Sequence, residues 1–173
     1  MAKKPYVKDF GFAQEIIKFR KLAQENEVVI GVTGDKALED VDADMRVVDI
    51  AAVHEFGTIN GRVPERSFIR AGVDENISKI QKDVVTVTEM VADGRLTSEQ
   101  ALDAVGQRAV GYVRARIQKG IKPDLKPATK REKAKDGGTG KSTPLIRTGR
   151  LINSLTHVVR EKGSTPDDAR KKK

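Results

Sequence analysis

The sequence contains no cysteine and no tryptophan, and aromatic residues make up only 4% of its 173 residues. The lack of cysteine excludes disulfides, thiolate nucleophiles and Cys-ligated zinc. No run approaches the roughly 20 apolar residues of a membrane span, and the basic N-terminus lacks the apolar stretch of a secretory signal. These absences favour synthesis and assembly in a reducing cytoplasm, without membrane contact.

Apolar residues are also scarce, at 38%, whereas 34% of residues are charged. With so few aromatics, the core must be built mainly from Val, Ile, Leu and Ala. A thin core is typical of a subunit that completes its burial against neighbours, although solvent-facing helices explain the same composition equally well. The length predicts a single domain over residues 1–162, followed by a disordered basic tail over 163–173.

Charge is distributed unevenly along the chain. The net charge is +8, but residues 1–110 hold 15 Lys/Arg and 19 Asp/Glu, whereas residues 111–173 hold 18 and 6. The basic second half is consistent with binding to nucleic acid. Halves of opposite sign are equally suited to docking head-to-tail on an identical neighbour, and the excess charge can also belong to solvated loops.

Hydrophobic periodicity predicts an α+β domain in which a short β-sheet packs on two or three helices, with flexible termini. Thr97 and Gln100 have the spacing of a capping box at the start of the clearest helix, which Gly120 ends. The β-rich run 84–88 weakens the prediction of helix around it. The remaining elements are helices near 9–25, 45–56 and 68–91, and strands near 27–33 and 156–160.

Residues 121–143 combine prolines, glycines and many lysines, which predicts a long, mobile basic loop. Its segment GGTGKST resembles a phosphate-binding loop, but Lys135 stands where the first glycine of that motif is required and Pro144 follows instead of a helix. We therefore do not expect nucleotide binding. The loop has the charge to contact phosphates but no aromatic side chain to stack on bases.

No group of residues predicts catalysis, a metal or a cofactor. His54 and His157 are far apart in sequence and belong to no metal motif, so we interpret His54 as a structural residue at a helix end. The acidic residues between 35 and 44 lack the glycine and closing glutamate of a calcium loop and are interpreted as a solvated turn. The sequence thus predicts a protein that is not an enzyme.

Two segments resemble the signature of a known family. Residues 54–58 (HEFGT) and 63–70 (VPERSFIR) look like the "HEFGT, then IPxRPFLR" signature of tailed-phage virion morphogenesis and tail-completion proteins. Residues 144–155 (PLIRTGRLINSL) resemble the "PLIDTGRLxNSI" segment that closes the same family. Ser67 replaces a proline of the family pattern. Arg147 replaces an aspartate, which removes any salt bridge that the acid would make.

The resemblance implies a non-enzymatic structural protein of the virion neck or upper tail, assembled in the host cytoplasm. Such a small α+β subunit would form a homo-oligomeric ring that joins the portal side of the capsid to the tail. Its partners would be identical subunits and other neck, portal-adaptor or tail proteins, with nonspecific contact to passing DNA as a further option. The alternative is a basic, non-enzymatic nucleic-acid-binding protein.

The candidate interface residues are charged side chains of the two motifs and of the basic loop. Arg66 and Arg70 are expected to pair with Glu55, Glu65 or a neighbouring subunit, because a guanidinium suits carboxylates at interfaces. A plain surface role for either arginine remains equally open. The complete set of candidates is Glu55, Arg66, Arg70, Lys126, Lys130, Arg131, Lys133, Arg147 and Arg150.

Overall fold

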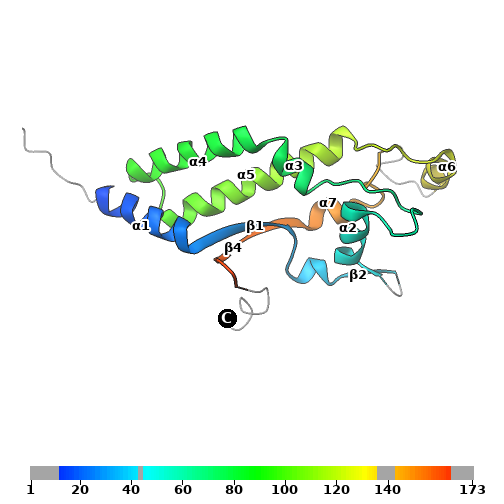
Figure 1. Cartoon of the computed structure of the whole chain (residues 1–173), viewed down its shortest axis with the longest axis horizontal. Helices are drawn as coiled ribbons and strands as arrows, with labels where there is room; N and C mark the ends of the chain where they lie inside the picture. Colours follow the sequence, from blue (N-terminus) through cyan, green and yellow to red (C-terminus); the bar gives the residue numbers. More distant parts are fainter. Residues whose placement is uncertain (1–11, 43–44, 136–142, 165–173) are drawn as a thin grey trace, which may run out of the picture.

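The protein is an elongated α+β domain, which confirms the predicted fold class (Figure 1). The computed structural model describes residues 12–42, 45–135 and 143–164. The helices in these ranges are α1 (Phe12–Glu25), α2 (Val47–Phe56), α3 (Arg70–Asp74), α4 (Ile77–Ala92), α5 (Ser98–Lys119), α6 (Pro127–Lys135), α7 (Arg150–Ser154) and the short 3-10 helix η1 (Asp35–Ala37). The strands are β1 (Asn26–Val32), β2 (Asp40–Asp42), β3 (Met45–Arg46) and β4 (Leu155–Glu161).

The main sheet pairs a strand from the first part of the sequence with a strand from its last part. β1 pairs antiparallel with β4, in a register that places Val29 opposite Val158 and Val32 opposite Leu155. The β2–β3 pair is a separate small sheet. α5 packs against the main sheet, and a Cβ atom at Gly106 would overlap the ring of His157. Glycine at position 106 therefore allows α5 to approach the sheet closely.

One end of the molecule is a helical layer made by α1, α4 and α5. Its buried side chains include Phe19 from α1 and Val91 from α4, packed against Ala101, Leu102 and Val105 of α5. The predicted capping box starts α5, because Thr97 Oγ1 accepts from the Gln100 amide at 3.2 Å and Gln100 Oε1 accepts from the Thr97 amide at 2.9 Å. This end is the part that sequence periodicity describes best.

The other end has its own cluster of buried residues, gathered around α2, α7 and the second half of α5. Phe68 is fully buried there and anchors this part of the chain in the core. It packs in the same cluster as Val47, Val113, Ile117 and Leu155. Because α5 contributes to both clusters, one continuous helix joins the two ends.

The helix predicted over 68–91 is wrong as a single element. The chain instead forms α3 and α4, interrupted at Glu75 and Asn76. The Asn76 side chain donates to the Gly72 carbonyl at 2.9 Å, and asparagine competes in this way with helical hydrogen bonding. The β-rich run 84–88 is helical within α4, where Val87 is fully buried and the hydroxyls of Thr86 and Thr88 donate to carbonyls four residues earlier.

The long loop predicted over 121–143 is wrong for its central part, since residues 127–135 form α6. Pro127 occupies the first helical position, where its missing N–H costs nothing, and the Ala, Lys, Arg and Glu residues that follow favour a helix. Smaller differences concern residues 45 and 46, which belong to β3 instead of the predicted helix. The predicted start of the first helix at 9–11, the GGTGK segment and most of the C-terminal tail lie outside the described residues.

Candidate functional site: the first motif and the groove beside it

Glu55 is the organising residue of the first motif. It ends α2 in a buried position, where only 5% of its surface is exposed, and its carboxylate faces the start of α3. Its oxygens accept hydrogen bonds from the backbone amides of Phe68, Ile69 and Arg70 at 2.8 to 3.1 Å. The Ser67 hydroxyl donates a fourth bond at 2.7 Å. Glu55 thus binds the amides at the start of a helix that lies elsewhere in the sequence.

The same contacts determine the charge of Glu55. Burial alone would raise the pKa of its carboxyl, but the hydrogen bonds from Ile69, Ser67, Phe68 and Arg70 hold that pKa below its usual value of 4.5. Glu55 is therefore ionised at neutral pH while its oxygens are engaged within the chain. Its contacts give it an internal structural role, whereas the sequence had presented it as a candidate for contact with a neighbour.

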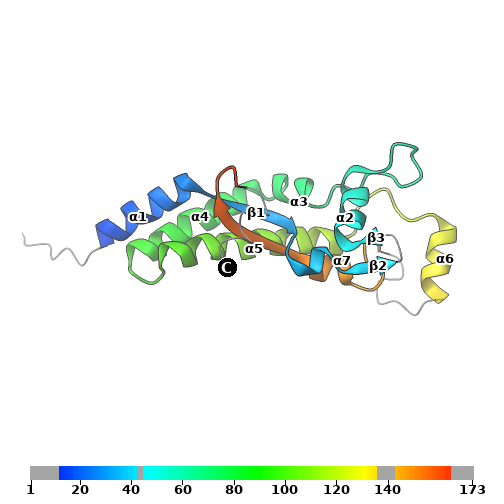
Figure 2. The same ribbon diagram turned by 90° about the horizontal axis from the view of Figure 1, so that it is seen from below.

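Between Glu55 and Ser67 the chain forms a loop closed by its own hydrogen bonds. The Thr58 amide donates to the Val63 carbonyl at 2.9 Å, and the Val63 amide donates to Thr58 Oγ1 at 2.9 Å. Gly57 has φ +73°, and a Cβ there would lie 2.9 Å from the Glu65 nitrogen, so this position requires glycine. The loop projects from the domain, with Ile59 fully exposed (Figure 2).

Arg66 is buried, with 6% exposure, and does not pair with Glu55 or Glu65. Its guanidinium donates to the backbone carbonyls of Pro123 and Asp124 at 2.8 and 3.3 Å. The prediction of an ion pair to a glutamate of the chain is therefore wrong for Arg66. It is correct for Arg70, whose Nη2 lies 2.6 Å from Glu65 Oε1 on an exposed part of the surface.

The two sequence motifs meet at a groove with a volume of about 610 Å³. His54 and Val63 line it from the first motif, Val53 lies just before that motif, and residues 145–151 line it from the second. β2, β3 and α6 complete the walls. The aliphatic side chains that form its floor are Val41, Ile50, Val53, Leu145, Ile146 and Leu151. Sequence reasoning missed this apolar floor, because its members come from four separate segments.

Lys133 joins α6 to the second motif. Only 8% of this residue is exposed, and its ammonium donates hydrogen bonds to the carbonyls of Thr143 and Ile146. Burial lowers the pKa of Lys133, and the positive charges of Arg147 and Arg66 lower it further. Several cations are thus close enough to interact electrostatically beside the groove. The buried position of Lys133 differs from the mobile loop predicted for it.

The other predicted interface residues lie at the same end of the molecule. Arg147 and Arg150 are exposed and line the groove, and Arg150 Nη1 donates to the Asp40 carbonyl at 3.4 Å. Lys130 is half-buried and its Nζ lies 2.5 Å from Asp124 Oδ2. Lys126 and Arg131 are exposed and lie outside the groove lining.

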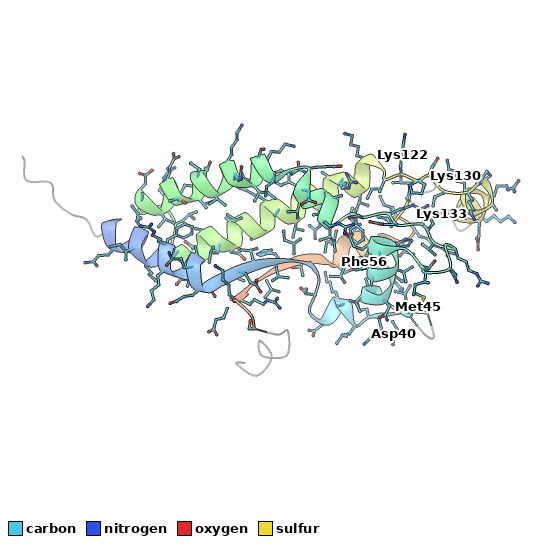
Figure 3. The ribbon with its side chains drawn as sticks, viewed as in Figure 1. Asp40, Met45, Phe56, Lys122, Lys130 and Lys133 are labelled. Carbon is cyan, nitrogen blue, oxygen red and sulfur yellow. The ribbon has the colours of Figure 1, made fainter. Side chains whose placement is uncertain are left out.

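Figure 3 shows Lys130 and Lys133 at α6 and Lys122 on the segment between α5 and α6, with Phe56 beside α2. These three lysines therefore come from one short helix and from the segment just before it.

His54 lines the groove with a half-buried ring. Its Nδ1 atom is buried and has no hydrogen-bond partner among the residues that the structure describes. Burial lowers the pKa of His54 below 6.5, and the nearby positive charges of Arg66 and Lys133 lower it further. The imidazole is therefore neutral at pH 7. His54 lies in the last turn of α2, at the helix end that the sequence predicted for it.

The opposite side of α2 carries a second apolar surface. Val32, Val48, Ala52, Phe56 and Ile69 line a hollow of about 360 Å³ there. Phe56 is 70% exposed, which is unusual for a phenylalanine. Apolar side chains thus lie on both sides of α2, facing the groove on one side and solvent on the other.

In the ranges 12–42, 45–135 and 143–164, no cluster of three His, Asp or Glu side chains has the arrangement to hold a metal ion. None of the helices in these ranges is both long and apolar enough to cross a membrane. The arrangement is that of a small α+β protein with an apolar groove bordered by cations. Comparisons with protein-family models, with curated proteins and with solved structures found no match to this chain.

Proposed function

We propose that this protein is a structural subunit of the neck or upper tail of a tailed phage. In this proposal it acts without catalysis, by assembling into a homo-oligomeric ring that joins the portal side of the capsid to the tail. The observation that carries the proposal is the convergence of the two motif segments. His54 and Val63 of the first motif are separated from residues 145–151 of the second by α3, α4, α5 and α6 in the sequence, yet both groups line one groove.

The exposed apolar surface beside this groove supports assembly. Ring formation requires head-to-tail contact, in which two different surfaces of the same subunit face each other. Phe56 and Ile59 expose apolar area at one end of an elongated domain, and such area is stabilised when a neighbour covers it. On the far end, Val84 and Val85 of α4 are also exposed. These two surfaces are candidates for the two sides of the contact.

The proposal is tested with the purified full-length chain. We expect mass photometry and negative-stain microscopy to show a closed ring whose population depends on salt, because charged residues surround the candidate surfaces. Phe56→Ser should reduce ring formation without changing the thermal midpoint, since Phe56 is exposed. The matched control is Lys162→Ser, a substitution at an exposed residue that directly follows the C-terminal end of β4. A chain that stays monomeric at every concentration contradicts ring assembly.

The virion role has its own test. Deleting the gene from the phage that encodes it should leave mature heads and separate tails, visible by electron microscopy. Complementation with the wild-type chain should restore joined particles, and the Phe56→Ser variant should restore fewer. Infectious virions of normal morphology in the deletion strain contradict a role in the neck.

A second candidate function is nonspecific nucleic-acid binding, favoured by the cations of α6 at positions 130, 131, 133 and 135. It predicts an affinity for duplex DNA that falls by about 10³-fold or more between about 50 and 200 mM salt, if six or more phosphates are neutralised. Fluorescence anisotropy with labelled duplex and single strands measures this directly. No binding at low salt removes this candidate.

A further inference from the structure

The groove between the two motifs has the size and lining of a binding site. Its volume of about 610 Å³ falls within the range of about 300 to 1,000 Å³ typical of ligand pockets. Such pockets combine an apolar lining with a few polar groups that fix orientation. Here the floor is aliphatic, and the polar lining residues include Thr129, Lys133, Thr148 and His54.

The charge of the lining has one sign. Lys133, Arg147 and Arg150 are positive, and no aspartate or glutamate is among the described residues that line the groove. Arg147 and Arg150 are exposed at the groove, and Arg150 also donates to the Asp40 carbonyl. Lys133 is buried, and its pKa is lowered first by that burial and then by repulsion from the positive charges of Arg147 and Arg66. A negative charge in the groove would offset this repulsion.

We propose that the groove binds a peptide segment of a partner protein that carries carboxylates next to branched aliphatic side chains. An aliphatic side chain would pack on Val41, Ile50 and Leu145, and carboxylates would receive charge-assisted hydrogen bonds from Arg147 and Arg150. This inference rests on the proposed function, to which it adds the chemistry of the neighbour in the neck.

The apolar floor distinguishes this occupant from nucleic acid. A phosphate backbone would use the arginines but would leave the six aliphatic side chains of the floor without an apolar partner. A peptide that carries both carboxylates and aliphatic side chains would contact Arg147 and Arg150 and the aliphatic floor at the same time. Burial of one leucine-sized side chain contributes favourably to binding. The lining has no aromatic side chain on which a base could stack.

The test is an unbiased selection from a library of random peptides against the full-length chain. We expect the enriched peptides to contain Asp or Glu beside Leu, Ile or Val. Their affinity, measured by fluorescence anisotropy, should fall by about tenfold or more in the double variant Arg147→Glu/Arg150→Glu. Substituting the aliphatic residues of the peptide by serine should also weaken binding.

The matched control is Lys126→Glu/Arg131→Glu, which changes the net charge equally at exposed positions outside the groove. This variant should change the affinity by about twofold or less, because its charges are farther from the ligand. Thermal melts of both variants verify folding.

The proposal is overturned if the enriched peptides lack carboxylates, if both double variants bind equally, or if no peptide is enriched. It is also overturned if an oligonucleotide displaces the peptides from the groove. Peptide binding is measured on the isolated chain and ring formation by mass photometry, so the failure of this inference is distinguishable from failure of ring assembly.

Discussion

The two ends of this molecule bury different kinds of side chain. At the helical end, α1, α4 and α5 enclose a cluster of apolar residues such as Phe19 and Val91. At the groove end, the apolar cluster around Phe68 is joined by buried Glu55, Arg66 and Lys133. The buried charged groups all bind backbone atoms of distant segments. Helix packing therefore stabilises the helical end, whereas hydrogen bonds from side chains to the backbone organise the groove end.

The strongest test of this difference is Glu55→Ala. We expect a loss of about 3 kcal/mol or more in the free energy of unfolding, because three backbone amides and the Ser67 hydroxyl would lose their acceptor. Urea denaturation measures the loss, and hydrogen exchange should accelerate at Phe68, Ile69 and Arg70. Glu65→Ala, at an exposed glutamate close by, should cost about 1 kcal/mol or less. Equal losses in the two variants would contradict the role of Glu55.

The helical end should respond to loss of volume instead. Val91→Ala removes two methyl groups from a fully buried position and should cost about 2 kcal/mol. Val85→Ala on the same helix, at a side chain that is 58% exposed, should change stability by about 0.5 kcal/mol or less. Both values come from urea denaturation. Neither variant should alter peptide binding in the groove, and a change there would show that the ends are coupled.

The pH dependence of stability should separate the groove end from the helical end. The pKa of His54 is lower in the folded chain than its usual value of 6.5, so the unfolded chain binds more protons. Stability is therefore fully present above pH 6.5 and is lost as the pH falls through the lowered pKa, by at most about 1.4 kcal/mol per pH unit. His54→Gln should flatten this part of the curve.

Glu55 acts in a more acidic window. Its pKa is below 4.5 in the folded chain, so its contribution is present above pH 4.5 and is lost as the pH falls further. Denaturation at a series of pH values measures both windows on one protein. A wild-type curve that is flat between pH 6.5 and 5 would contradict the assignment to His54.

The smallest effect is expected for the exposed pair of Arg70 and Glu65. Its coupling energy in a double-mutant cycle should be about 0.5 kcal/mol and should decrease with added salt, because solvent screens the two charges. The same cycle applied to Glu55 and Ser67, whose hydrogen bond is part-buried, should give a larger value that depends less on salt. Similar values for the two pairs would remove the distinction between buried and exposed polar contacts in this motif.

The sequence predicted correctly the features whose signals are local, and it missed features that depend on contacts between distant segments. The capping box at Thr97 and the helix that it begins were predicted correctly, because their signals lie within one local segment. The break at Asn76 was missed, since asparagine is compatible with helix interiors as well as with interruptions. α6 was missed because Pro127 and the lysines were interpreted as loop signals, and the contacts of Lys133 with Thr143 and Ile146 are not apparent from sequence.

The candidate site was predicted only in part. Both motif segments were identified, and the charged residues selected from them do cluster at one end of the molecule. The groove itself and its aliphatic floor were not predicted, because Val41, Ile50 and Leu145 lie in different elements. The ring, its neighbours and any contact with DNA stay predictions.

Sequence by itself determined the α+β class, the amphipathic helices and the segments that carry the motifs, because periodicity and capping act over a few neighbouring residues. The tertiary structure decided which charges are internal and which are accessible. Glu55, Arg66 and Arg70 look alike in a linear motif, yet the first two are buried on backbone groups and the third is exposed. Desolvation and hydrogen bonding across distant segments make that difference, and both depend on the folded arrangement.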